Sequence, residues 1–321
     1  MGPLITVLAT ASIALLPATS MAQNWPAKPV RLIVTVAAGS GSDVTARLAA
    51  PKMAEALGQP VVVENIAAMG GSIGAERVSH LAPDGYNLMV TTPSPIIAAF
   101  FQRKTVPYKL TDFTPITAAV EPVTVLIASP TGAASLKEFI EYARRSPGKA
   151  SYGTPGIGSV FHLMGEALAS SAGIKMLHVP YKGFVQQVTD ISGGQLDITL
   201  TALSNVQAQV SAGKLRALAV LEGTRYPGLP NAPSVNETLP RFEKPASWYG
   251  LFGPAPLPAP ITQRLYQEMT RAITAPEARS RLEASGMTLI ANTPEEFTAL
   301  IRRGFEVYGN VFKAAGLQPE D

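Results

Sequence analysis

The chain has 321 residues, of which 46% are hydrophobic and 15% are charged, a balance typical of a folded protein with an ample core. It contains no cysteine, which excludes disulfides, thiolate zinc sites and a cysteine nucleophile. The formal net charge is only +3 and the basic residues are scattered, so the charge gives little support to nucleic-acid binding.

The first 22 residues have the pattern of an export signal. Residues 4–16 form an apolar run broken by small residues, and Ser20 and Ala22 suit cleavage before Gln23. The run is shorter than the about 20 apolar residues that a spanning helix needs, and no Lys or Arg precedes it. We expect a signal peptide over residues 1–22 and a periplasmic mature chain.

From residue 29 onward, short β-branched runs alternate with helical patterns. The first half predicts strands over residues 30–36, 61–63 and 87–91 and helices over residues 44–57 and 72–81. The second half predicts strands over residues 123–129, 150–153, 178–179, 198–200 and 215–220 and helices over residues 135–145 and 159–171. Beyond residue 252 the pattern is helical. Two α/β units and a helical tail predict a two-lobed α/β protein.

Each half has one glycine-rich loop between a strand and a helix. The first covers residues 37–43 and the second covers residues 152–159. Glycines allow backbone N–H groups to converge, and the start of a helix adds partial positive charge, so each loop is suited to an anion. Hydrogen bonds to a charged group contribute about 1.5–3 kcal/mol each, so a carboxylate needs no arginine here. The alternative is that both loops are ordinary turns that cap their helices.

Two further motifs suggest other functions. Gly39-Ser40-Gly41 followed by Glu64 partly matches a dinucleotide fingerprint, but Val44 occupies the third glycine position. Residues 70–74 match the G-x-S-x-G nucleophile elbow and make an exported serine hydrolase that uses Ser72 the enzyme alternative. Because residues 65–69 separate the preceding strand from this serine, a Ser72 that caps a helix is the stronger interpretation.

The three histidines, His80, His162 and His178, show no metal-ligand spacing, and we expect neither a metal nor a cofactor. His162 follows the second loop by one helical turn and is a candidate for a cleft wall. Trp248 and Tyr249 are expected to pack in the core or at a hinge rather than to stack on a ligand.

Ordered motifs along most of the chain resemble the Bug-type periplasmic receptors of the tripartite tricarboxylate transporters, which are TctC-like proteins. The matching stretches are residues 25–34, the first glycine loop with Asp43, and residues 61–65, 70–74, 83–86, 152–156, 178–183, 193–197 and 213–220.

The resemblance implies a periplasmic-binding-protein (Venus flytrap) fold with a ligand cleft between two lobes. Lobe 1 is then residues 23–124 plus 248–321, and lobe 2 is residues 125–247, with two crossing segments as the hinge. It also implies a monomeric solute-binding protein, not an enzyme, that captures a di- or tricarboxylate, an aromatic acid or an acidic amino acid. Its partners are then the membrane permease subunits of a tripartite transporter. A ligand-presenting accessory protein for a sensor has the same binding physics and remains an alternative.

The expected ligand contacts are carried over by motif position from the two glycine loops, the end of the third strand and the second lobe. They are Ala38, Gly39, Ser40, Gly41, Ser42, Asp43, Thr91, Thr92, Ser94, Gly153, Thr154, Pro155, Gly156, Gly158, Ser159, His162, Asp197 and Ser204.

The chain departs from the family pattern at three places. Ala38, Ser40 and Ser42 stand where the first loop usually has Pro and Gly, Ile66-Ala67-Ala68 replaces the usual Arg-Pro-Gly, and residues 92–95 form an atypical strand exit. Apolar neighbours such as Ile96, Ile157 and Phe161 are compatible with a flat aromatic acid. These departures affect the identity of the acid more than its class.

Overall fold

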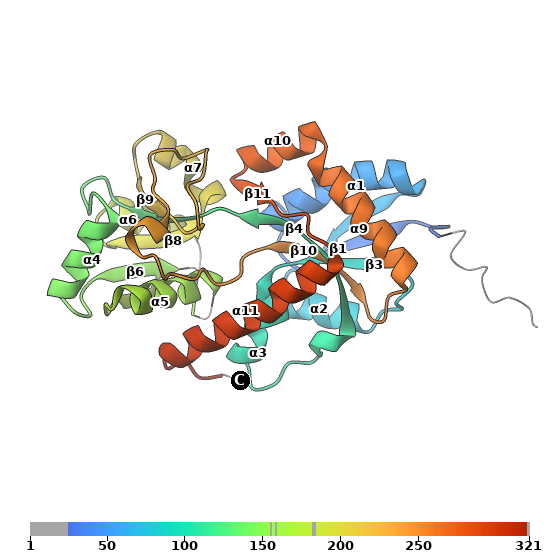
Figure 1. Ribbon diagram of the computed structural model, residues 1–321, viewed down its shortest axis with the longest axis horizontal. Coiled ribbons are helices and arrows are strands. Elements are labelled where there is room, and N and C mark those ends of the chain that lie inside the picture. Colours follow the sequence, from blue (N-terminus) through green and yellow to red (C-terminus); the bar gives the residue numbers. More distant parts are fainter. Residues whose placement is uncertain (1–24, 155, 158, 182–183, 320–321) are drawn as a thin grey trace, which may run out of the picture.

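The computed structural model describes residues 25–154, 156–157, 159–181 and 184–319. The expected signal peptide lies outside this part of the chain, as do the expected contacts Pro155 and Gly158. The described chain forms two lobes, each built on one sheet, that lie side by side along the longest axis (Figure 1). This arrangement confirms the two-lobed α/β fold predicted from the alternation of strands and helices.

The first lobe is built on a six-stranded sheet with the order β11-β4-β10-β3-β1-β2. Its strands are β1 (Val30–Val34), β2 (Val61–Asn65), β3 (Asn87–Thr91), β4 (Phe113–Pro122), β10 (Tyr249–Pro254) and β11 (Met287–Leu289). β1 lies between β3 and β2 and is parallel to both, whereas β10 and β11 pair antiparallel with their neighbours. The carboxyl ends of β1, β2 and β3 therefore meet at one edge of the sheet.

Helices cover both faces of this sheet. They are α1 (Gly41–Leu57), η1 (Met69–Gly71), α2 (Ser72–Ser79), η2 (Ser94–Ala98), α3 (Ala99–Gln102), η3 (Leu110–Asp112), α9 (Ala259–Thr274), α10 (Pro276–Ala284) and α11 (Pro294–Ala314). Successive residues of a strand point to opposite faces. Leu32 accordingly packs in a core with α1 and α9, and Ile33 packs in a core with α2 and α11. Burial on both faces explains the apolar run of residues 32–34 in β1.

The second lobe is built on a five-stranded sheet with the order β7-β6-β8-β5-β9. Its strands are β5 (Thr124–Ala128), β6 (Ser151–Thr154), β7 (Leu177–Pro180), β8 (Ile198–Ala202) and β9 (Arg216–Val220). Its helices are α4 (Leu136–Arg145), α5 (Val160–Ala172), α6 (Phe184–Ser192), α7 (Leu203–Ser211) and α8 (Val235–Thr238). β6 is parallel to β7 and β8, and β5 is antiparallel to β8 and β9.

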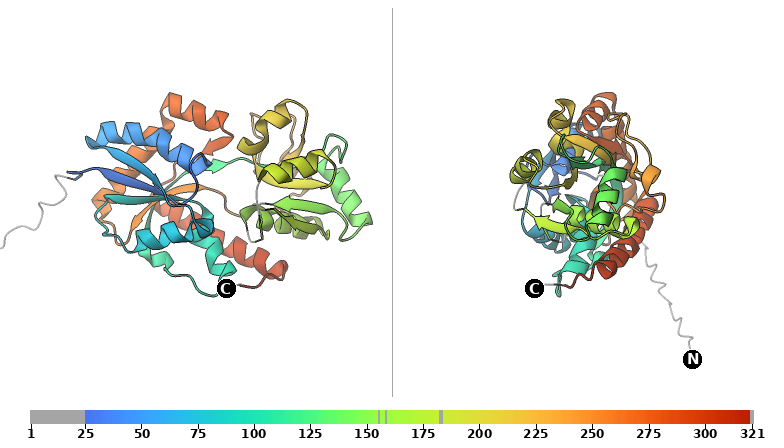
Figure 2. Two further views of the ribbon diagram at one scale, coloured as in Figure 1. Left: turned by 180° about the vertical axis from the view of Figure 1, so that it is seen from behind. Right: turned by 90° about the vertical axis from the view of Figure 1, so that its left-hand side faces the viewer.

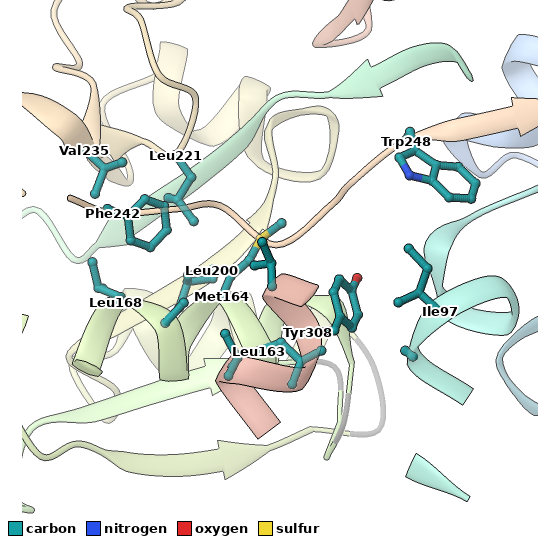
Figure 3. Packing of buried hydrophobic residues seen from close by; sticks show 14 of the residues in the cluster. Ile97, Leu163, Met164, Leu168, Leu200, Leu221, Val235, Phe242, Trp248 and Tyr308 are labelled. Atoms are coloured by element: carbon teal, nitrogen blue, oxygen red, sulfur yellow. The ribbon is translucent and has the colours of Figure 1, made fainter. Parts of the chain in front are cut away.

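The C-terminal helix α11 contacts both lobes. Figure 3 shows Tyr308 of α11 beside Leu163 and Met164 of α5, and all three side chains are fully buried. The view from behind shows α11 extending from the first lobe toward α5 (Figure 2). The helical tail therefore ties the lobes together on one side of the molecule.

Two chain segments cross between the lobes. The first is the passage from β4 to β5 at Val123, and the second leads from Leu239 to β10. Lys244 of the second segment forms ion pairs with Glu121 of β4 at 2.5 Å and with Glu222 of the second lobe at 2.7 Å. Burial acts to lower the pKa of Lys244, but the charges of Glu222 and Glu121 raise it above its ordinary value. Lys244 therefore stays charged and joins both crossings to the second lobe.

Several elements differ from the sequence-based expectation. The unpredicted strands are β4, β10 and β11, and the unpredicted helices include α3, α6, α7 and α8. α1 begins at Gly41 rather than at residue 44 because Ser40 caps it. β4 contains Pro115 and ends at Pro122, and proline argues against a strand. It forms because β10 and β11 pair with it on its two sides. Among the described helices, none is both long and apolar enough to cross a membrane.

Candidate ligand-binding site

A cavity of 480 Å³ lies between the lobes, within the range of about 300–1,000 Å³ typical of small-molecule sites. It is lined by residues 35–37, 67–71, 92–94, 122, 159–161 and 247–249. The first three stretches follow β1, β2 and β3, residues 159–161 begin α5, and the rest belong to the crossing segments.

The strand order explains why a cavity forms at this edge. The chain passes from β1 to β2 on one side of β1, and β3 adds on the other side. Loops that follow β1 and β3 therefore diverge at β1, which is the topological switch point where α/β sheets leave a crevice for ligands. The start of α5 closes this crevice from the second lobe.

The first glycine loop is closed by its own side chains. The buried carboxylate of Asp43 accepts hydrogen bonds from Gly39 N at 2.9 Å, from Arg47 Nε at 3.0 Å and from Asn65 Nδ2 at 2.9 Å. Ser40 Oγ accepts from Asp43 N at 3.4 Å and so caps α1. Burial acts to raise the pKa of Asp43, but the hydrogen bonds from Arg47, Gly39 and Asn65 outweigh it and leave the pKa below its ordinary value. An ionised Asp43 thus organises the loop from inside.

The second glycine loop is hydrogen-bonded to a histidine of the neighbouring strand. Thr154 is buried at the end of β6, and its Oγ1 lies 2.6 Å from Nε2 of His178 on β7. Ser159 N donates to Gly156 O at 3.3 Å, and Ser159 Oγ accepts from His162 N at 3.2 Å and caps α5. The amides of Val160 and Phe161, by contrast, have no acceptor among the described residues.

The two histidines of this lobe form a stacked pair behind the loop. The ring centroids of His162 and His178 lie 3.9 Å apart with an interplanar angle of 7°. Burial lowers the pKa of both rings to about 4, and for His162 the neighbouring His178 contributes. Tyr152 stacks beside them and donates to Glu166. Both imidazoles are therefore neutral at pH 7 and supply no positive charge to an anion.

The structure places three of the expected contacts, Thr92, Ser94 and Ser159, on the cavity lining. Thr91 lies just below, where its Oγ1 is 2.7 Å from Oγ1 of Thr35. Of the first loop, only Ala37 lines the cavity. The expected contacts that follow it in the loop lie beside the cavity; they are Ala38, Gly39, Ser40, Gly41, Ser42 and Asp43. Four further expected contacts lie behind the lining, at the end of β6, in the loop that follows it and in the first turn of α5. They are Gly153, Thr154, Gly156 and His162.

Two expected contacts lie elsewhere. Asp197 accepts hydrogen bonds from Ser151 N at 2.7 Å and Ser151 Oγ at 2.8 Å, and it lines a separate cavity of 360 Å³. Its carboxylate therefore ties β8 to β6 within the second lobe. Ser204 is exposed at the start of α7, next to the turn at Gly286.

Comparison with known proteins identifies the kind of molecule that carries this cavity. The family model described as the tripartite tricarboxylate transporter family receptor matches residues 45–317. The chain belongs to this family. The receptor is 32% identical to a UPF0065 protein of Bordetella pertussis, over 100% of both chains. It is also 30% identical to the protein BugT of the same organism, covering 96% of this chain and 95% of the other. The resemblance stated from the sequence motifs is thereby confirmed.

Solved structures agree with this assignment. The receptor matches R. palustris Rpa4515 with adipate at a TM-score of 0.81 and 28% identity, covering 92% of this chain and 100% of the other. It matches MatC from Rhodopseudomonas palustris with bound malate at a TM-score of 0.75 and 28% identity, covering 89% and 99%. Both support the predicted periplasmic-binding-protein fold.

The sequence motifs did not reveal that residues 67–71 form part of the wall of the receptor's cavity. Gly70 and Gly71 have φ values of 65° and 96°, and a Cβ on Gly71 would lie 2.9 Å from Oγ1 of Thr35. The glycine pair therefore lets this turn approach β1. The glycines of residues 70–74 were the sequence signal for this turn. The same pattern is also typical of a nucleophile elbow or of a helix capped by a serine.

The serine of that motif is buried. Gly71, rather than Ser72, occupies the cap position of α2, and Ser72 Oγ lies 3.4 Å from the hydroxyl of Tyr108. No histidine among the described residues forms a hydrogen bond to Ser72. The described residues therefore place no histidine as the base that a nucleophilic serine requires.

Two aromatic residues of the second crossing segment also line the cavity. Trp248 packs edge-on against Phe297, with ring centroids 4.9 Å apart, which agrees with the expected hinge packing. The Tyr249 ring covers Gly41, where a Cβ would lie 2.5 Å from Tyr249 Cε2. Burial raises the pKa of Tyr249 to about 12. Both residues therefore pack at the hinge and also line the cavity. The sequence did not reveal that they do both.

Proposed function

We propose that this receptor binds a small organic carboxylate reversibly between its lobes and delivers it to the permease subunits of a tripartite transporter. The observation that carries the proposal is the start of α5, where Val160 and Phe161 line the cavity and their amides have no acceptor among the described residues. Such a helix start is an anion site. Relatives solved with adipate and with malate support a carboxylate as the anion.

The two lobes offer complementary donors to a carboxylate. The second lobe contributes the α5 amides and the hydroxyl of Ser159, and the first lobe contributes the hydroxyls of Thr92 and Ser94. A carboxylate only accepts hydrogen bonds, so one group can be shared between the two sets. The closed state of the lobes is then stabilised by the ligand that bridges them.

Calorimetry and thermal unfolding with matched acids and amides test this function. Hexanoate, benzoate, adipate and malate are compared with hexanamide and benzamide, which lack the charge. At least one acid is expected to bind and to raise Tm, whereas the amides have no effect. Failure of every acid contradicts the proposal.

Val160→Pro tests the role of the α5 amides. Val160 is the first helical residue, where proline is tolerated, and Ser159 already has the extended conformation that precedes a proline, at φ −59° and ψ 156°. The substitution removes one N–H, and Val160→Ala is the control that keeps it. Because a hydrogen bond to a charged group contributes about 1.5–3 kcal/mol, Val160→Pro should weaken acid binding at least about tenfold relative to Val160→Ala. Equal affinities would contradict the role of this amide.

Delivery to a permease is tested in cells. Uptake of the radiolabelled acid that binds in calorimetry should require both the receptor and the permease subunits, and Val160→Pro should reduce uptake at low acid concentration. Uptake that continues without the receptor would contradict this part of the proposal.

A further inference from the structure

The cavity combines one anion-binding end with largely apolar walls. None of the described residues that line it carries a charged side chain. The apolar wall is formed from both lobes and the hinge, by Met69 of η1, Phe161 of α5, and Trp248 and Tyr249 of the crossing segment. The polar groups of the lining are all uncharged: they are the hydroxyls of residues 35, 92, 94, 159, 247 and 249, the indole N–H of Trp248 and backbone amides.

Among the residues that the structure describes, the cations near the cavity are engaged by other partners. Arg47 pairs with Asp43 and Lys244 is held between two glutamates, and neither lines the cavity. Arg103 donates to Met69 O at 3.2 Å and is also absent from the lining. His162 and His178 are neutral at pH 7 because burial lowers their pKa.

From this arrangement we infer the class of acid. We propose that the receptor prefers an acid with a single carboxylate and an apolar ring over a dicarboxylate. The inference rests on the proposed function, since the carboxylate occupies the start of α5. A second carboxylate beside Met69, Trp248 and Tyr249 would lose its water and gain only neutral donors, because none of the described residues that line the cavity is a cation, and burying a charge without a counter-charge is unfavourable. An apolar ring at the same place removes its own surface and that of the aromatic wall from water.

The turn between β2 and η1 sets this preference most directly. Ala67 and Ala68 line the cavity, are exposed, and offer only methyl groups there. A longer basic side chain at either position would reach the cavity from this turn. The short side chains therefore leave this wall of the cavity uncharged.

Two matched pairs of acids test the inference by calorimetry. Hexanoate and adipate differ only in the second carboxylate, as do benzoate and terephthalate. The monoacids should bind at least about tenfold more tightly than their diacids, and benzoate should bind more tightly than hexanoate. Tighter binding of adipate than of hexanoate overturns the inference and leaves the proposed function intact, whereas no binding by any acid contradicts the proposed function itself.

A charge introduced at the turn provides the second test. Ala68→Arg should shift the preference toward adipate at least about tenfold, because it supplies the missing cation. Ala212→Arg makes the same substitution at an exposed position that ends α7 and should leave the ratio of affinities unchanged. Thermal unfolding confirms that both variants are folded. An unchanged ratio in Ala68→Arg overturns the inference, because the uncharged wall then does not set the preference.

Discussion

The two glycine loops have similar sequences but different supports. The loop over residues 37–43 is braced by Asp43, a charged side chain inside it, and its residues from Ala38 onward lie off the cavity lining. The loop over residues 152–159 is braced by His178, a neutral side chain from a neighbouring strand, and it leads into the helix start that borders the cavity. In the first loop Gly39 N donates to Asp43, and in the second Gly156 N donates to Thr154 Oγ1 and Ser159 N donates to Gly156 O. Both loops therefore use some of their amides internally, and they differ in that only the second leads into a helix start that lines the cavity.

Acidification should therefore destabilise the second lobe before it affects the first loop. The pKa of His162 and of His178 is lowered from 6.5 to about 4 in the folded state. Between these values the unfolded chain binds protons that the folded chain does not, so the free energy of unfolding falls as pH falls. The fall is at most about 1.4 kcal/mol per pH unit for each ring. Asp43, whose folded pKa is lowered, stays ionised over this range.

Denaturant unfolding at several pH values checks this prediction. His162→Phe should reduce the pH dependence between pH 6.5 and 4, the range in which this histidine destabilises the fold. His80→Gln changes an exposed histidine and serves as the control. Carboxyl groups titrate equally in all three proteins, so only the differences are interpreted. An identical pH dependence in His162→Phe and wild type would show that the buried pair does not control acid stability.

Removal of the Asp43 carboxylate, which holds the first loop together, should lower the free energy of unfolding at neutral pH. Asp43→Ala leaves Gly39 N, Arg47 and Asn65 without their shared acceptor, and hydrogen bonds to a charged group contribute about 1.5–3 kcal/mol. We expect a loss of about 2–3 kcal/mol in denaturant unfolding. Asp43→Asn keeps an acceptor oxygen and should lose less. Variants that are as stable as the wild type would mean that the loop does not depend on its carboxylate.

Much of this architecture could be predicted from sequence periodicity. The strands β1, β3 and β5 contain the apolar runs of residues 32–34, 88–90 and 125–128, and runs of this kind are typical of buried strands in a two-sided sheet. β4 and β11 could not be predicted in the same way, because proline and short length hide strands whose pairing comes from distant segments. Local patterns thus identify elements that are stabilised locally and miss those that depend on tertiary pairing.

The site was harder to predict than the fold. The motif alone indicated an anion at both glycine loops, but the partners that distinguish them, Asn65 and His178, are far away in the sequence. Residues 67–71 and Tyr249 reach the cavity only because β2 and β10 deliver them to the same edge of the sheet. Spacing along the chain contains no information about that convergence.

Substitutions at two glycines of the first loop distinguish the effect of the backbone conformation of the loop from the effect of its contact with the cavity wall. A Cβ on Gly41 would overlap the Tyr249 ring at 2.5 Å, whereas a Cβ on Gly39 meets nothing within 4 Å. Gly41→Ala should cost about 1–3 kcal/mol of stability through overpacking and weaken ligand binding, because the displaced ring is part of the cavity wall. Gly39→Ala, at φ +80°, should cost about 1 kcal/mol through backbone strain and leave affinity unchanged. Calorimetry and denaturant unfolding measure both effects, and equal changes in affinity would contradict the assignment of Tyr249 to the wall.

The smallest expected effects compare the two helix caps. Ser40 caps α1 away from the cavity lining, and Ser159 caps α5 on it. Each substitution to alanine should cost about 1 kcal/mol of stability, but only Ser159→Ala should also weaken acid binding. An aspartate at either position keeps the cap and adds a negative charge. Ser159→Asp should therefore retain stability and lose acid binding through repulsion, whereas Ser40→Asp should retain both. If Ser40→Asp abolishes binding as completely as Ser159→Asp, the ligand charge lies between the two loops, and the difference in their supports does not decide which of them holds the ligand.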